Sequence, residues 1–164
     1  MQLRWSGARH LPVDELRRRL DRIAVPVGKV RIADLVPPAP GMSNGLYFFF
    51  ARSDVAYVGR AKSRAFVERI PAHFDTREEG WFGTLLKLLA ASKKASPAAT
   101  RQQVLPEALG MRLALLLSDD GRANIAVAET ALRHAFAPTL NAPKRPRPID
   151  PRASLDSLSR GHRR

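Results

Sequence analysis

The chain has no cysteine, and it has no apolar run long enough to cross a bilayer. The lack of cysteine excludes disulfides, thiol nucleophiles and thiolate metal ligands, and it is compatible with a reducing compartment, so we expect a cytoplasmic protein. No stretch of about 18 apolar residues occurs, so we expect no transmembrane helix. The segment from Met1 to Leu11 is charged but is not followed by an apolar stretch, so we expect no secretory signal.

Acidic residues are scarce relative to basic ones. There are 15 Asp and Glu against 28 Lys and Arg, which gives a formal net charge of +13 on 164 residues. Apolar residues make up 45% of the chain, so the composition is that of a folded protein. A positive field of this size most often neutralises phosphate, which favours a nucleic-acid partner. The alternative is a high arginine content that serves no partner.

Three regions are predicted along the chain. Residues 1–40 form a basic helical extension, in which Leu16, Leu20 and Ile23 follow the spacing of one apolar stripe, and which ends in a proline-rich linker. Residues 41–143 form the main domain. Residues 144–164 hold seven basic and two acidic side chains with several prolines, which predicts a disordered basic arm. This arm either follows phosphates or is a solvated terminus without a role.

The order of strands and helices expected in the main domain predicts an α+β fold with a small three-stranded antiparallel sheet flanked by helices. Strands are expected at 45–51, 55–59 and 111–118, the first two as a hairpin, and helices at 62–70, 81–91 and 123–136. The helix that starts at Trp81 could contact nucleic acid, but we expect Trp81 and the leucines that follow it to lie in the core.

Six polar or ionisable residues on or next to the predicted strands and helices are candidates for a catalytic site. They are Tyr47, Tyr57, Arg69, His73, Glu129 and Asn141. Each residue also has an ordinary structural explanation. A strand tyrosine or a lone histidine usually packs, Glu129 could pair with Arg133 four residues later on its helix, and Asn141 could cap a turn.

Glu129 is the least ordinary member of this set, because it lies in a nearly continuous apolar run from Ile125 to Leu132. A carboxylate at such a boundary needs a cation, hydrogen-bond donors or a raised pKa. A hard cation such as Mg²⁺, with several waters, suits a single carboxylate in a chain without cysteine.

Together these features resemble the GIY-YIG nuclease family over residues 41–143. The triplets Gly45-Leu46-Tyr47 and Tyr57-Val58-Gly59 are similar to the motifs that name the family, the stretch YVGRAKS is similar to that of its excision-repair members, and the ending PTLN matches its last motif. The resemblance implies a nuclease fold that hydrolyses phosphodiester bonds in DNA with one divalent metal ion, Mg²⁺ or Mn²⁺.

The resemblance also implies roles for individual residues. Glu129 would be the metal ligand, Tyr47 the base or proton relay near the attacking water, and Tyr57 the residue that orients water or phosphate. Arg69 would stabilise the phosphate charge, His73 would assist proton transfer, and Asn141 would hold the geometry of the site.

The catalytic arginine departs from the family pattern. Arg69 lies two residues further from Tyr57 than is usual, and Arg64 competes for the role. Arg69 is preferred because it precedes His73 by four residues, although Pro71 is expected to end the helix between them. Phosphate contacts are predicted for six basic residues: Arg60, Lys62, Arg64, Lys144, Arg145 and Arg147.

The sequence thus predicts a metal-dependent DNA endonuclease. The alternative is a non-catalytic nucleic-acid-binding module that keeps the same fold. A third possibility, an interaction domain without nucleic acid, must explain the charge and the motifs separately. A protein partner or a homodimer cannot be read from the sequence.

Overall fold

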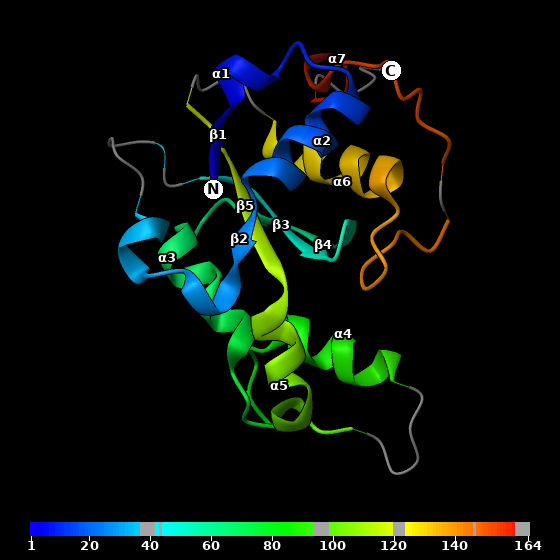
Figure 1. Ribbon diagram of the computed structural model, residues 1–164. Coiled ribbons are helices and arrows are strands. Elements are labelled where there is room, and N and C mark those ends of the chain that lie inside the picture. Colours follow the sequence, from blue (N-terminus) through cyan, green and yellow to red (C-terminus); the bar gives the residue numbers. More distant parts are fainter. Residues whose placement is uncertain (37–41, 43, 94–98, 120–123, 146, 160–164) are drawn as a thin grey trace.

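The computed structural model describes residues 1–36, 42, 44–93, 99–119, 124–145 and 147–159 (Figure 1). Residues 37–41 of the predicted linker, residue 123 of the last predicted helix and residues 160–164 of the predicted arm lie outside this part. Among the described helices, none is both long enough and apolar enough to cross a membrane.

A mixed five-stranded sheet forms the centre of the molecule. The hairpin of β3 (Gly45–Ala51) and β4 (Asp54–Ala61) is antiparallel, and β3 also pairs antiparallel with β5 (Arg112–Leu117). The three predicted strands and their antiparallel pairing are therefore confirmed, as is the α+β class.

The prediction of a sheet with only three strands is wrong. The other edge of β5 pairs in parallel with β1 (Gln2–Arg4) and, further along, antiparallel with β2 (Val25–Pro26). These strands have three and two residues, too few to show the alternation of polar and apolar residues by which strands are found in a sequence. The N-terminal segment therefore belongs to the same sheet as the main domain.

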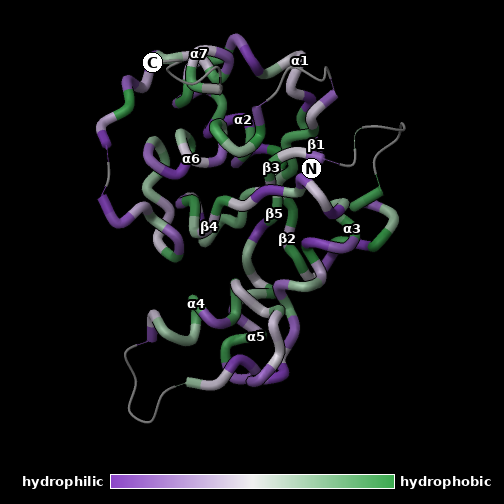
Figure 2. Tube along the Cα trace, turned by 180° about the vertical axis from the view of Figure 1, so that it is seen from behind, coloured by the Kyte–Doolittle hydropathy of each residue, from purple (hydrophilic) through white to green (hydrophobic). Residues whose placement is uncertain are grey.

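The two faces of the sheet carry separate cores. Leu46, Phe48 and Phe50 of β3 face one side, whereas Tyr47 and Phe49 face the other, as alternation along a strand requires. Figure 1 shows the helices divided in the same way, and Figure 2 shows hydrophobic colouring along β3 and β5 between them. The first face is covered by α1 (Trp5–Ala8), α2 (Val13–Ile23), α6 (Ile125–Phe136) and α7 (Leu155–Ser159). The second is covered by α3 (Phe66–Arg69), α4 (Thr84–Ser92) and α5 (Arg101–Gly110), with the 3₁₀ turns η1 (Val27–Lys29), η2 (Ile32–Leu35) and η3 (Pro71–Phe74).

The helices follow the predicted order with three differences. The helix expected from residue 62 begins only at Phe66, and it ends at Arg69 because Pro71 starts η3. The helix expected from Trp81 begins at Thr84, and the Trp81 side chain is 94% exposed, so its assignment to the core is wrong. The leucines that follow Trp81 on the sheet side are buried, as predicted.

The third difference is α5, which the sequence analysis did not predict. Its start is well marked, because Thr100 and Gln103 form a reciprocal capping box. Its interior contains Pro106 and shows almost no amphipathic periodicity, so the signals that identify most helices are absent.

Part of the predicted disordered arm is folded. The Leu155 side chain at the start of α7 is fully buried, and the backbone N–H of Asp156 donates to the carbonyl of Arg9 at 2.8 Å. Ser154 also forms a β-bridge with Pro12. Leu155 and Leu158 pack in the first core, where α7 contacts α6, although the segment is basic and rich in proline.

We expect Leu155→Ala to lower the free energy of unfolding by about 2–5 kcal/mol, because it removes a fully buried leucine from the packed face. Urea denaturation measures this change. The exposed Arg152→Ala on the same segment is the control, with an expected change within about 0.5 kcal/mol. Equal, small effects of both substitutions would contradict the docking of α7.

Candidate active site

Tyr47 lies on the central strand β3 and its ring passes across the neighbouring strand. Tyr47 and Gly59 are register partners on β3 and β4. A Cβ atom at position 59 would lie 2.3 Å from Cζ of Tyr47, closer than any real side-chain contact. Glycine is thus required at position 59, because only its missing side chain leaves room for the phenol ring.

His73 fixes the Tyr47 hydroxyl. Its Nε2 lies 2.7 Å from the Tyr47 oxygen, and its Nδ1 accepts the backbone N–H of Leu85 at 3.3 Å. Because Nδ1 is used as an acceptor, the neutral ring carries its proton on Nε2 and donates it to the Tyr47 oxygen. The Tyr47 O–H can then donate outside this pair, and a side-chain hydrogen bond with Tyr47 lowers the pKa of Tyr57.

The surroundings keep both groups neutral. Burial, and then the charge of Arg69, lower the pKa of His73 to about 3 from its ordinary 6.5. Burial raises the pKa of Tyr47 well above its ordinary 10, with the nearby Tyr57 phenol adding to the effect and Arg69 opposing it. At neutral pH the site therefore holds a neutral imidazole and a neutral phenol.

Tyr57 and Arg69 complete this side of the site. The rings of Tyr47 and Tyr57 stack with centroids 6.2 Å apart and planes at 19°. Burial raises the pKa of Tyr57, and the positive charge of Arg69 is the main influence that lowers it. Arg69 thus acts on both phenols, whereas Arg64 is exposed and stacks on Phe82, which favours Arg69 as the arginine of the site.

Glu129 lies among three arginines. Its Oε2 is 3.1 Å from a terminal guanidinium nitrogen of Arg60, and its side chain is only 16% exposed. Burial raises the pKa of Glu129, and the charges of Arg60, Arg133 and Arg69, in that order, oppose this rise. The structure therefore brings the carboxylate into the electrostatic range of the phenols and of Arg69.

Arg133 was missing from the predicted site. Its Nε donates to the carbonyl of Asn141 at 2.8 Å, and its charge lowers the pKa of both Glu129 and Tyr57. The signal was available, because Arg133 follows Glu129 by four residues on α6. On a helix face, that spacing by itself predicts only an ion pair between Glu129 and Arg133.

Asn141 holds the backbone of β4 beside Tyr57. Its Oδ1 accepts the Val58 N–H at 3.1 Å, and its Nδ2 donates to the Val58 carbonyl at 2.7 Å. The preceding residues Thr139 and Leu140 donate to carbonyls of Val55 and Ala56. The stretch Thr139–Asn141 therefore pairs with the edge of β4 and fixes the strand that carries Tyr57 and Arg60.

A small basic hollow adjoins these residues. It has a volume of about 220 Å³ and is lined by Arg60, Lys62, Ser63, Arg64 and Arg69. Three of the six predicted phosphate-contacting residues thus meet here, together with Arg69. Four cations and a hydroxyl, with no acidic lining residue, favour an anion such as phosphate.

The remaining predicted phosphate contacts lie on the segment after α6. Arg147 lines a groove of about 800 Å³ between α6 and this segment, and Arg60 lines the same groove. The backbone N–H of Arg147 donates to Nδ1 of His134 at 2.9 Å. Lys144 and Arg145 are exposed and line neither the groove nor the basic hollow.

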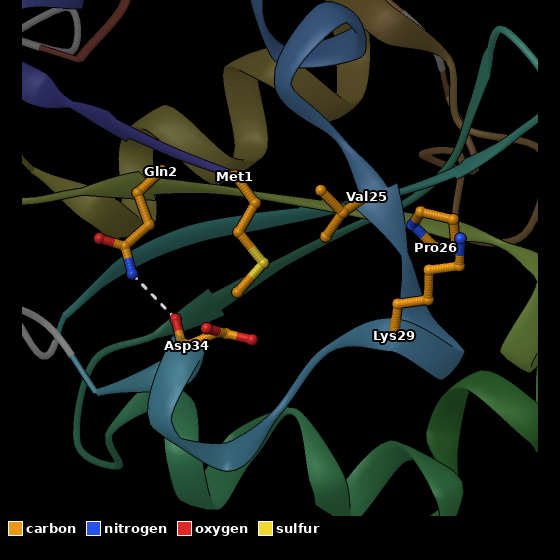
Figure 3. A pocket seen from close by; sticks show the side chains of 6 residues that line it. All are labelled: Met1, Gln2, Val25, Pro26, Lys29 and Asp34. Carbon is orange, nitrogen blue, oxygen red and sulfur yellow. Dashed lines mark hydrogen bonds between the residues drawn. The ribbon is translucent and has the colours of Figure 1, made fainter.

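Another hollow, of about 520 Å³, lies away from these residues, among β1, β2, η1 and η2 (Figure 3). In it Nε2 of Gln2 donates to the carbonyl of Asp34 at 2.9 Å, and Lys29 is the basic lining residue. None of the predicted site residues lines this hollow, so it is separate from the candidate active site.

Glu129 is the only carboxylate among the predicted site residues, so it is the one side chain of this set that would bind a hard divalent cation. Among the described residues, no group of three or more His, Asp or Glu side chains is placed to hold a metal ion. Mg²⁺ is commonly held by one or two carboxylates together with substrate phosphates and several waters, a donor set in which Glu129 would be the one carboxylate. Its present partner Arg60 would have to move aside.

Comparisons of the chain with protein-family models, with curated proteins and with solved structures find no match in any of the three. The functional conclusion therefore rests on the residues themselves and on their geometry.

The neutral His73 predicts a loss of stability in acid. The unfolded chain takes up a proton on His73 near pH 6.5, whereas the folded site resists protonation down to about pH 3. The contribution of His73 to the free energy of unfolding is therefore fully present above pH 6.5. Below that pH it falls by about 1.4 kcal/mol per pH unit.

Urea unfolding between about pH 7 and pH 4 measures this slope. We expect His73→Asn, which keeps an acceptor for the Leu85 N–H, to show a shallower pH dependence than the wild type. His10→Asn controls for the loss of an exposed imidazole. Parallel curves for the wild type and His73→Asn would count against the buried neutral ring.

Proposed function

We propose that this protein is a DNA endonuclease that hydrolyses phosphodiester bonds with the help of one divalent cation, Mg²⁺ or Mn²⁺. The observation that carries this proposal is the convergence of two phenols, a neutral imidazole, Arg69 and one half-buried carboxylate beside a basic hollow. These groups come from β3, β4, α3, η3 and α6, and the last of these elements begins more than fifty residues after η3. The resemblance to GIY-YIG nucleases is consistent with this arrangement.

The basic hollow is the expected seat of the scissile phosphate. Arg69 lines it and also acts electrostatically on both tyrosines, so it links the phosphate site to the phenols. A guanidinium can donate to two phosphate oxygens at once, and it stays charged at any working pH. Arg69 is therefore suited to stabilise the charge that builds on these oxygens in the transition state.

Tyr47 would act on the attacking water through Tyr57, because the Tyr47 side chain is fully buried and is hydrogen-bonded with Tyr57. The raised pKa of Tyr47 makes it a weak acid and keeps it protonated at neutral pH, so the phenolate is scarce. Because His73 donates its Nε2 proton to the Tyr47 oxygen, His73 does not accept the Tyr47 proton in this state. His73 instead orients the hydroxyl and would stabilise negative charge on it. Tyr57, stacked beside it, can direct a second hydroxyl to the water or the phosphate.

Glu129 would hold the cation together with waters. When bound, a divalent cation supplies positive charge to the phosphate oxygens and makes water more acidic. Arg60 neutralises Glu129 in the present arrangement and also lines the hollow. A phosphate that enters the hollow offers Arg60 a second anionic partner, so substrate can release the carboxylate for the cation.

The Arg60–Glu129 ion pair also favours the second candidate function, a nucleic-acid-binding module without catalysis. In that case Glu129 would serve only to hold Arg60 at the hollow. The two functions differ in whether cleavage depends on the carboxylate.

Glu129→Gln should abolish cation-dependent nicking of supercoiled plasmid DNA, with a loss of at least about 100-fold, because the amide removes the charge that attracts the cation. Circular dichroism and urea unfolding check that the variant stays folded.

Glu107→Gln is the matched control, since it neutralises an exposed carboxylate on α5, and it should cut as the wild type does. Equal cutting by both variants would remove Glu129 from the mechanism. DNA binding by a wild type that cuts with neither Mg²⁺ nor Mn²⁺ would support the binding module.

Arg69→Lys and Arg64→Lys distinguish the two candidate arginines. Both substitutions keep the positive charge but remove the planar guanidinium that can donate to two phosphate oxygens. The substitution at the reacting phosphate should therefore lower the cleavage rate about 100-fold, whereas the other should weaken DNA affinity only a few-fold. We expect the larger loss for Arg69. Single-turnover rates at saturating DNA measure it, and the opposite ranking would assign the role to Arg64.

A further inference from the structure

Trp81 is an exposed aromatic side chain on the loop between η3 and α4. It is 94% exposed, and the adjacent Phe82 is 37% exposed. Burial of an aromatic side chain is strongly favourable, so two neighbouring exposed rings leave a large apolar area in water. Such a patch commonly marks a binding site.

The backbone of this loop is fixed from within by a buried arginine. Arg101 at the start of α5 is only 3% exposed, and its guanidinium donates to four carbonyls of the loop. They belong to Arg77, Glu78, Gly80 and Phe82.

Gly83 closes the loop and leads into α4. It adopts a left-handed conformation with φ +81°, and its N–H donates to the Ala72 carbonyl at 2.7 Å. At the other end, the carboxylate of Asp75 accepts from both the backbone and the guanidinium of Arg77, which lowers the pKa of Asp75 to about 2. Trp81 is thus presented on a preorganised backbone, which reduces the entropy lost on binding.

The aromatic pair is joined to the basic hollow by Arg64. The Arg64 guanidinium lies over the Phe82 ring, 5.5 Å from its centroid, and Arg64 also lines the hollow. The exposed acids Glu78 and Glu79 line a hollow of about 480 Å³ together with Trp81 and Phe82, whereas Arg64 lines the basic hollow. A bound polyanion would therefore place its phosphates on the Arg64 side, with its flat apolar groups toward Trp81.

We propose that Trp81, supported by Phe82, is a stacking platform for an unpaired base of a nucleic-acid strand whose phosphates occupy the basic hollow. The proposal rests on the nucleic-acid binding of the proposed function and defines its substrate as single-stranded or locally opened DNA. A base within a duplex is stacked on both faces, so only an unpaired base offers a free face to Trp81.

Binding without metal ions tests the platform separately from cleavage. Fluorescence anisotropy of the cleavage-deficient Glu129→Gln protein would use labelled oligothymidylate of about twelve nucleotides, an abasic strand of equal length and a blunt duplex. Adding Trp81→Ala should weaken binding of oligothymidylate by about 5- to 100-fold. Binding of the abasic strand and of the duplex should change by less than about twofold.

Two further variants separate stacking from general damage. Trp81→Phe should restore most of the affinity, because it keeps an aromatic face. Leu109→Ala removes an exposed apolar side chain from the opposite end of α5 and should leave all three affinities unchanged.

The two tryptophans give an independent measurement. Trp5 is buried and Trp81 is exposed, so acrylamide should quench mainly Trp81. Oligothymidylate should protect Trp81 from this quenching, and the abasic strand should not.

The platform is overturned if Trp81→Ala leaves oligothymidylate affinity unchanged or weakens all three ligands equally. It is also overturned if anionic vesicles, and not oligothymidylate, protect Trp81. The expected binding pattern in a protein that never cleaves would uphold the platform and reject only the hydrolase.

Discussion

The hydrogen bond between Tyr47 and His73 is the interaction on which the rest of the site depends. It is buried in the second core, and the N–H of Leu85 at the start of α4 determines which nitrogen of the imidazole carries the proton. The bond therefore joins the sheet to η3 and α4. Gly59 makes the arrangement possible, because any larger residue on β4 would occupy the space of the phenol ring.

The second constraint is the balance of charge around Glu129. One carboxylate lies within range of Arg60, Arg69 and Arg133, and the neighbouring hollow adds Lys62 and Arg64. The excess of positive charge favours a polyanion over a neutral or cationic ligand. In the proposed function, a cation at Glu129 would be most favourable once phosphate has neutralised part of this field, so substrate and cation would bind cooperatively. Without them, Arg60 is the ion-pair partner of Glu129.

Short irregular segments hold the strands and loops around the site in place. Thr139–Asn141 pairs with the edge of β4, α7 docks on the first core, and Arg101 fixes the loop that presents Trp81. None of these segments has the long apolar periodicity of a core element. Each is held instead by one or two buried side chains or by a concentrated set of hydrogen bonds to backbone carbonyls, which stabilise short irregular structure effectively.

The sequence by itself determined the order of the long elements, the β3–β4 hairpin and the candidate residues around Tyr47 and Glu129, because periodicity and local motifs are properties of neighbouring residues. Only the tertiary structure decided that β1 and β2 join the sheet, that α5 forms around Pro106, and that Trp81 lies in solvent. It also revealed Arg133 beside Glu129, Tyr57 and Asn141. These outcomes depend on contacts between residues far apart in the chain, such as Leu155 against the first core and Arg101 against the loop, and no local pattern records which distant partner will satisfy a buried group.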